Sequence, residues 1–330
     1  MTENKRASSL ILAIQNPRVV RTDRSPARTP SSKGHSLAIG RNETVVQAAC
    51  REGLALDPSV LPIQGPPGAG KTFTGARMIC QLVNQGKKVG VTAVSHKVIR
   101  NLLDKVLDAA GEINGAEISC AHRKEGADPD SRPVREIGTN EEALQSLQSG
   151  AVNILGGTPW LWCREEFRDS VHILFVDEAG QMSLANVLAC APAGKSLVLL
   201  GDPQQLEQPQ QGSHPEGSDI SALAHLLDNR KTISEGQGLF LAETWRLHPA
   251  ICSFTSELFY EGRLVSFNGL ERQNIQAPAP FCGAACGLYP SSMKATRAIQ
   301  QKKSSWSPRS LKCSHRLDLP GLTGAAVSDP

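Results

Sequence analysis

The chain has 330 residues, of which 40% are hydrophobic and 4% aromatic, so it can bury the core of one large or two medium domains. The net charge of +3 is uneven, since residues 1–35 and 271–330 each carry +5 and residues 36–270 carry −7, and the total therefore indicates little about a nucleic-acid partner. No apolar run reaches the roughly 20 residues that span a bilayer. We expect a cytoplasmic globular protein without membrane attachment, with its nine cysteines reduced.

The first 35 residues are rich in Pro, Ser and Arg, which predicts a mostly disordered basic segment. A short apolar run at 10–14 favours a strand within it. Residues 42–50 are then predicted to form a helix that carries Gln47. The next apolar run, 60–64, is typical of a buried strand and is followed by helical spacing from Thr74 to Val83.

A glycine-rich loop joins that strand to that helix and fits G-x-x-x-x-G-K-[ST] without a mismatch. Its residues are Gly65, Pro66, Pro67, Gly68, Ala69, Gly70, Lys71 and Thr72. Such a loop turns backbone N–H groups toward phosphate oxygens at the positive end of the helix. Lys71 would reach the β- and γ-phosphates of ATP and Thr72 would bind Mg²⁺. The alternative is a glycine turn that only enters a helix. With a nucleotide bound, Gln47 is a candidate for the base edge, although a lone glutamine is often only a surface residue.

Four more runs are typical of strands buried on both faces: 88–94, 152–155, 171–176 and 196–200. A helix is predicted through Leu102 to Leu107, and the polar residues 111–140 are predicted to be the least regular part. Strands that alternate with helices predict an α/β fold with a parallel sheet. Ligands of such sheets bind at the carboxyl ends of the strands.

Two adjacent acids, Asp177 and Glu178, follow the strand 171–176. At this edge Asp177 would hold Mg²⁺, and Glu178 would act as the base for the attacking water. Alone, such a pair would suit a solvated strand end or a helix cap. Gln205 follows the next strand, where it would contact the γ-phosphate or the water, although its turn is an ordinary one by itself.

Taken together, the chain resembles superfamily 1 helicases, in the branch typified by the helicase of nonsense-mediated mRNA decay. Four segments carry the resemblance: 65–72, 177–181, 201–206 and 243–249. Within that branch it is most similar to bacterial proteins that join such a helicase to a RecB-like nuclease. The resemblance implies a RecA-like P-loop NTPase sheet over 36–236 and the start of a second RecA-like domain over 237–268, followed by a tail of low order over 269–330.

The resemblance also implies further site residues. Arg246 would be an arginine finger, and Gln47 matches the family's adenine-reading glutamine. Ser95, His96, Lys97 and Thr158 match positions that touch the backbone of a single strand.

The later motifs of the second domain are absent, so we expect a truncated motor. Cys282, Cys286, Cys313 and His315 have spacings that fit no usual zinc site, and none is predicted.

The sequence thus predicts an ATPase of helicase type that uses ATP and Mg²⁺ and acts as a monomer on single-stranded DNA or RNA. Two alternatives remain: a nucleotide-binding module without motor activity, and a P-loop kinase or transporter-type ATPase. With few aromatic residues, contact with a strand would be mainly to its phosphates. The residue types do not indicate whether that strand is DNA or RNA.

Overall fold

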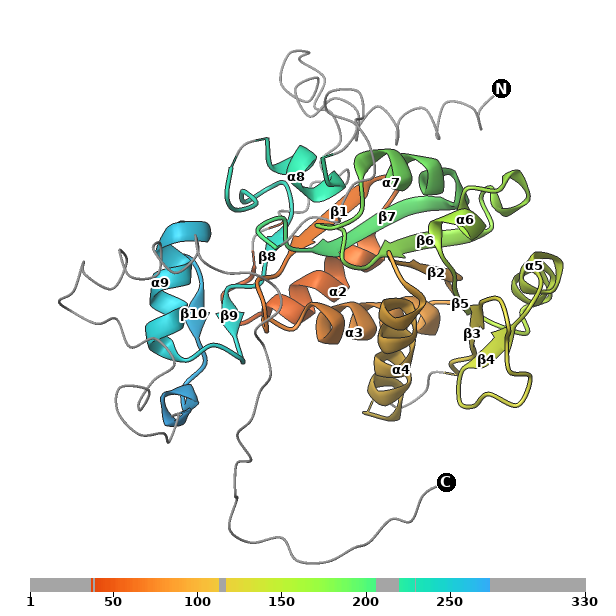
Figure 1. Cartoon of the computed structure of the whole chain (residues 1–330), viewed down its shortest axis with the longest axis horizontal. Helices are drawn as coiled ribbons and strands as arrows, with labels where there is room; N and C mark the ends of the chain where they lie inside the picture. Colours follow the sequence, from red (N-terminus) through yellow and green to blue (C-terminus); the bar gives the residue numbers. More distant parts are fainter. Residues whose placement is uncertain (1–36, 38, 113–116, 206–219, 229, 274–330) are drawn as a thin grey trace, which may run out of the picture. The chain divides into compact units, whose positions relative to one another are not determined.

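The structure is a computed structural model that describes residues 37, 39–112, 117–205, 220–228 and 230–273 (Figure 1). The predicted disordered segment 1–35, its short strand and nearly all of the predicted tail lie outside these residues. So do the four candidates for a zinc site.

The described residues build a sheet of eight strands in the order β4-β3-β5-β2-β6-β7-β1-β8. The strands are β1 (Val60–Gln64), β2 (Val89–Thr92), β3 (Cys120–Arg123), β4 (Arg135–Ile137), β5 (Ile154–Gly156), β6 (Val171–Val176), β7 (Gly194–Gly201) and β8 (Leu239–Phe240). Every neighbouring pair in this sheet is parallel. The predicted α/β fold with a parallel sheet is therefore confirmed.

Helices cover both faces of the sheet (Figure 1). The helices are α2 (Val45–Ala55), α3 (Lys71–Asn84), α4 (His96–Glu112), α5 (Asn140–Ser149), α6 (Pro159–Trp162), α7 (Leu184–Cys190) and α8 (Ala222–Leu227). Buried residues of α2, α3 and α4 form one apolar cluster with the strands, and those of α5, α6, α7 and α8 form another.

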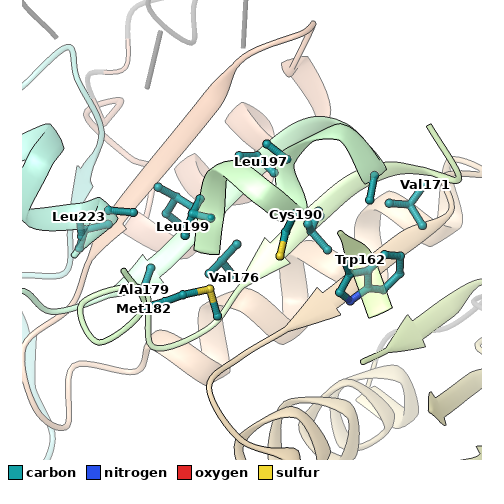
Figure 2. Close-up of a cluster of buried hydrophobic side chains, with 14 of the residues drawn as sticks. Trp162, Val171, Val176, Ala179, Met182, Cys190, Leu197, Leu199 and Leu223 are labelled. Atoms are coloured by element: carbon teal, nitrogen blue, oxygen red, sulfur yellow. The ribbon is translucent and has the colours of Figure 1, made fainter. Parts of the chain in front are cut away.

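The alternation of side chains along each strand explains the two clusters. In β6, Ile173 and Phe175 join the cluster of α3, whereas Leu174 and Val176 join the cluster of α7. Figure 2 shows the second cluster, with Val176, Leu197 and Leu199 of the sheet beside Cys190 of α7. Because both faces are buried, the central strands need continuous apolar runs, and this is the pattern in their sequence.

Two parts of the sheet differ from the sequence-based expectation. Residues 111–140, predicted to be the least regular part, contain β3 and β4. These strands have only four and three residues and lie at one edge of the sheet, so they lack a long apolar run. At the other edge, β8 pairs with β1 through Ile63↔Leu239 and Gln64↔Phe240. The start of the segment expected to open a second domain therefore belongs to the first sheet.

The chain continues through β9 (Glu243–Thr244), α9 (Pro249–Phe259) and β10 (Val265–Ser266), and β9 and β10 form a parallel pair. This segment has no separate core, because Cys252, Tyr260 and Leu264 are buried in the same cluster as α7 and β7. None of the described helices is long and apolar enough to cross a membrane.

Candidate nucleotide site

The glycine loop connects the carboxyl end of β1 to the first residue of α3, as the sequence predicts. Gly70 is the N-cap of α3 with φ of 83° and no side-chain cap. The N–H groups of the first helical turn, from Lys71 to Phe73, have no acceptor within the helix. An anion at this point would meet both these donors and the positive end of the helix dipole.

The loop leaves no room for larger residues at Gly68. Its φ is 76°, in the left-handed region that glycine favours, and a Cβ there would lie 2.3 Å from Cβ of Arg246. Thr244 and Trp245 also hold the loop. Thr244 Oγ1 donates to the carbonyl of Pro67 at 2.8 Å, and the N–H of Trp245 donates to the carbonyl of Gly68 at 3.0 Å. The residues that precede α9 thus lie directly on the phosphate loop.

The side chain of Lys71 turns back onto the loop, where Nζ donates to the carbonyl of Gly65 at 2.8 Å. The neighbouring acid, Asp177, follows β6 and is 2% exposed. Burial, together with the adjacent negative charge of Glu178, raises the pKa of Asp177 to about 7, although the hydrogen bond from the Glu178 N–H and the positive charge of Lys71 act against this rise. A buried carboxyl group in this state binds either a proton or a cation.

Thr72 and Asp177 are chemically suited to Mg²⁺. Mg²⁺ is usually held by one or two protein oxygens together with substrate phosphates and water, not by a cage of protein ligands. The described residues contain no group of three or more His, Cys, Asp or Glu side chains that could hold a metal ion. The hydroxyl of Thr72 makes no hydrogen bond to another described residue, and it lies in the first turn of α3.

Glu178 has an unusual backbone. Its φ is 52°, which is uncommon for a residue other than glycine, and such outliers cluster at functional sites. The turn is held by the Glu178 N–H, which donates to Oδ1 of Asp177 at 2.9 Å, and by the Gln181 N–H, which donates to the carbonyl of Glu178. The carboxylate of Glu178 has no hydrogen bond or ion pair with any residue the structure describes.

The turns after β6 and β7 pack backbone against backbone. A Cβ on Gly180 would lie 2.2 Å from the carbonyl oxygen of Asp202. Asp202 is 1% exposed and organises the second turn. Its Oδ1 accepts a hydrogen bond from the N–H of Gln204, and its carbonyl accepts one from the N–H of Gln205. Gln205 is partly exposed at this edge.

Tyr260, directly after α9, also binds Asp202. Its hydroxyl donates to Oδ2 of Asp202 at 2.7 Å. Burial and this hydrogen bond raise the pKa of Tyr260 above its ordinary value. The sequence analysis predicts no contact between Tyr260 and Asp202, and the sequence signal for it is limited to an acid directly after the apolar run of β7.

A cavity of about 720 Å³ adjoins the loop. Its lining comes from three regions: the start of α2, the phosphate loop with the first turns of α3, and the segment from β8 to β9. The lining residues are Thr44, Val45, Val46, Gly68, Ala69, Gly70, Phe73, Thr74, Arg77, Leu241, Ala242, Glu243 and Trp245. The guanidinium of Arg77 lies 3.3 Å from the ring centroid of Phe73, and Trp245 stacks on Phe267 at 3.6 Å.

Gln47 does not line this cavity. Its side chain forms a capping box with Thr44, in which Oε1 of Gln47 accepts from the N–H of Thr44 at 2.8 Å. The predicted helix is present but starts at Val45, and the glutamine serves its N-terminus.

The four candidates for strand contact lie at the carboxyl ends of β2 and β5. Ser95 caps α4 by accepting from the N–H of Val98 at 3.3 Å, and His96 and Lys97 are exposed at the start of that helix. Thr158 is the N-cap of α6 and makes no side-chain cap. These residues occupy the same edge of the sheet as the phosphate loop, but on different strands.

The chain is similar in sequence to several curated proteins. It is 24% identical over 274 residues to DNA replication ATP-dependent helicase/nuclease DNA2 of Gallus gallus, covering 79% of this chain and 26% of that protein. It is 26% identical over 285 residues to DNA-binding protein SMUBP-2 of Mus musculus, covering 70% of this chain and 28% of that protein. The chain thus spans about a quarter of the length of these relatives.

A structural comparison finds a likeness to the arterivirus nonstructural protein 10 helicase in complex with DNA, with a TM-score of 0.41 and 17% identity, covering 68% of this chain and 43% of that one. The resemblance to helicases of the nonsense-mediated-decay branch is confirmed by the sequence relatives, while the similarity to bacterial nuclease fusions stays a prediction. The protein-family model described as AAA domain matches residues 44–218 of this chain. This chain therefore belongs to the AAA domain family.

Proposed function

We propose that this chain binds ATP with Mg²⁺ and hydrolyses it, as the catalytic lobe of a helicase-type ATPase that acts on single-stranded nucleic acid. The observation that carries the proposal is the phosphate loop with Lys71 beside the buried Asp177. The loop with Lys71 supplies contacts for the phosphates, and Asp177 supplies a site for a cation. A nucleoside triphosphate with its metal ion needs both.

The residues of the loop and of the sheet edge take separate roles in this proposal. The N–H groups of Gly68, Gly70 and the first turn of α3 surround the phosphates, and Lys71 neutralises the β- and γ-phosphates. Thr72 and Asp177 hold Mg²⁺, which shields the phosphate charge as the terminal bond breaks.

Glu178 orients the attacking water and accepts its proton, and Gln205 contacts the γ-phosphate or the water. Their carboxylate and carboxamide groups make no side-chain hydrogen bond or ion pair with other described residues, so both are available to a ligand. Asp202 and the close approach of Gly180 fix the two turns that carry them.

The cavity of about 720 Å³ suits the base and ribose, because it opens at Gly68–Gly70 and its wall includes the aromatic rings of Phe73 and Trp245. Trp245 already stacks on Phe267 with one face. Gln47 stays the candidate for the base edge on the family resemblance alone, because its Oε1 accepts from the N–H of Thr44 and the residue does not line the cavity.

Arg246 is the proposed arginine finger. Its Cβ would lie 2.3 Å from a Cβ placed on Gly68, and its guanidinium forms no ion pair with an acid among the described residues. We propose that a second RecA-like domain begins after Leu241, because β8 belongs to the first sheet. An arginine finger contributes about 10³–10⁵ in rate when it is fixed in place, so we expect weak ATPase activity and no strand separation by this chain alone.

Ser95, His96, Lys97 and Thr158 are proposed to contact the phosphates of a single strand of DNA or RNA. We further propose a cytoplasmic monomer. A nucleotide-binding module without motor activity is the second candidate, and the contacts of Tyr260 with Phe240 of β8 and with Asp202 favour it, because lobes that cannot separate cannot move along a strand.

Steady-state ATP turnover, with and without single-stranded DNA and RNA, tests the proposal. We expect slow Mg²⁺-dependent hydrolysis that single strands accelerate and that Lys71→Ala abolishes. Hydrolysis without stimulation by any strand would support the module, and equal turnover by Lys71→Ala would contradict the assignment of the loop.

A further inference from the structure

An exposed tryptophan lies at the carboxyl edge of the sheet, away from the phosphate loop. Trp160 is the second residue of α6 and is 82% exposed, although tryptophan is on average a highly buried residue. The helix begins directly after β5, whose neighbours are β3 and β2. Trp160 therefore belongs to the same edge as Thr158, Ser95 and Lys97.

A second tryptophan explains why Trp160 faces outward. Trp162 is 1% exposed, and its Nε1 donates to the carbonyls of Val91 at 3.2 Å and Gly157 at 3.1 Å. Its ring also meets Phe167 edge-on, with centroids 5.7 Å apart. Two residues of an α-helix that are two positions apart point about 200° away from each other. The contacts that bury Trp162 thus hold Trp160 on the opposite side of α6.

Positive charge collects on the strands beside Trp160. Arg123 ends β3, and the register His122↔Gly156 brings the end of β3 level with the end of β5. His96 Nδ1 lies 3.0 Å from Nε2 of His122, which joins the first residue of α4 to β3. Burial lowers the pKa of His96, and so do the nearby charges of Lys124 and Arg123, while the charge of Glu125 acts against them.

Two of these cations lack an acidic partner. Lys97 and Arg123 have no carboxylate within 4.0 Å among the residues that the structure describes, and Nε of Arg123 is buried without a hydrogen-bond partner among them. By contrast, Arg164 and Arg168, which follow α6, pair with Glu166 and Glu165. The free positive charge therefore lies on the β3 and β2 side of Trp160.

We propose that Trp160 is a stacking platform for one base of a single strand, whose phosphates contact Lys97 and Arg123. An exposed aromatic face beside unpaired cations matches the two parts of a single-stranded nucleic acid, its bases and its phosphates. A duplex keeps its bases stacked inside and cannot offer a free face. The inference rests on the proposed function, because it assumes that this edge binds a single strand.

Three variants at one position separate stacking from other effects. Trp160→Ala removes the side chain, Trp160→Leu keeps apolar volume without a ring, and Trp160→Phe keeps a smaller ring. Binding is measured by fluorescence anisotropy with labelled oligodeoxythymidylate, oligouridylate and an abasic strand of equal length. Because Trp160 is exposed, melting temperatures and ATP affinity are expected to equal those of the parent. Should the alanine variant not fold, the comparison of Phe with Leu carries the test.

For Trp160→Ala and Trp160→Leu we expect affinity for the base-containing strands to fall by about 5- to 150-fold, the range for loss of one stacked base. Trp160→Phe should retain most of the affinity. The slope of log affinity against log salt should not change for these variants, whereas Lys97→Ala should reduce it by about 1. On the abasic strand, the parent and Trp160→Ala should bind equally. A loss of affinity for either oligodeoxythymidylate or oligouridylate supports the inference and shows whether this edge binds DNA or RNA.

The outcomes distinguish this inference from the function on which it rests. If the parent binds the strands and Trp160→Ala binds them equally well, stacking is wrong while the proposed function stands. If Trp160→Leu binds the strands as tightly as the parent, stacking is also wrong, because an apolar side chain without a ring is then sufficient. Such a result would favour a protein segment as the partner of this tryptophan. No binding of any strand by the parent would overturn both.

Discussion

Replacing Asp177 by asparagine should stabilise the ligand-free protein at alkaline pH. The carboxyl of Asp177 is 2% exposed, and its pKa is raised from 3.8 to about 7. Between these two pH values the folded state binds a proton that the unfolded state has lost. Stability from this group is therefore fully present below about pH 4 and is lost as pH rises toward 7.

The size of the effect follows from the same shift. Each pH unit corresponds to about 1.4 kcal/mol per proton, so a shift over roughly three units gives an upper limit of about 4 kcal/mol at pH 8. Asparagine has nearly the same shape and no charge to bury. We expect Asp177→Asn to unfold at a higher temperature than the parent at pH 8 and at nearly the same temperature at pH 4.

Ligand binding should reverse this order. With MgATP present at pH 8, the parent should gain stability by mass action, whereas Asp177→Asn should gain much less because the charge that holds Mg²⁺ is gone. The assay is thermal unfolding of both proteins at pH 4 and pH 8, with and without MgATP. Equal or lower stability of ligand-free Asp177→Asn at pH 8 would refute the idea that the carboxylate is buried at a cost and kept for a cation.

Three further changes test the site. Glu178→Gln should leave ATP binding intact and reduce turnover by roughly 10²-fold or more, as measured by phosphate release; turnover at the parent rate would move the base elsewhere. Gly68→Ala should weaken ATP binding and lower the melting temperature, because φ at this position is 76° and the new Cβ would lie 2.3 Å from Cβ of Arg246. Gly86→Ala is the matched control, since φ there is a similar 71° and the space around it is open. Tyr260→Phe should lower the free energy of unfolding by about 1–3 kcal/mol, since the buried Asp202 loses a donor, and unchanged stability in denaturant titration would contradict the importance of that hydrogen bond.

The central strands and the phosphate loop could be predicted from sequence because their signals are local. The run Val171–Val176 coincides with β6, since a strand buried on both faces needs apolar residues at every position. Lys71 begins α3 because the glycine at position 70 adopts a left-handed conformation that ends the loop. The position of Asp177 at a strand end then followed from the length of the apolar run. The catalytic roles of these residues remain predictions.

The rest depends on contacts between distant parts of the chain, which no local pattern encodes. β8 has two residues and exists as a strand because β1 offers it a free edge. The Tyr260 hydroxyl and Asp202 are 58 positions apart in sequence, and neither residue type predicts the other. The contact of Gln47 with Thr44 is local, three residues apart, yet the sequence analysis does not include it, and the role of Gln47 at the base edge stays a prediction.

Titration of ATP into the purified chain at pH 8, with and without Mg²⁺, tests the central claim most directly. Isothermal calorimetry should show one ATP bound per chain, weaker binding when Mg²⁺ is removed, and a large loss of affinity in Lys71→Ala, whose fold can be checked by its melting curve. The absence of ATP binding by the parent, or an affinity that Lys71→Ala leaves unchanged, would contradict the assignment of this loop and of the buried Asp177 as a site for ATP and Mg²⁺.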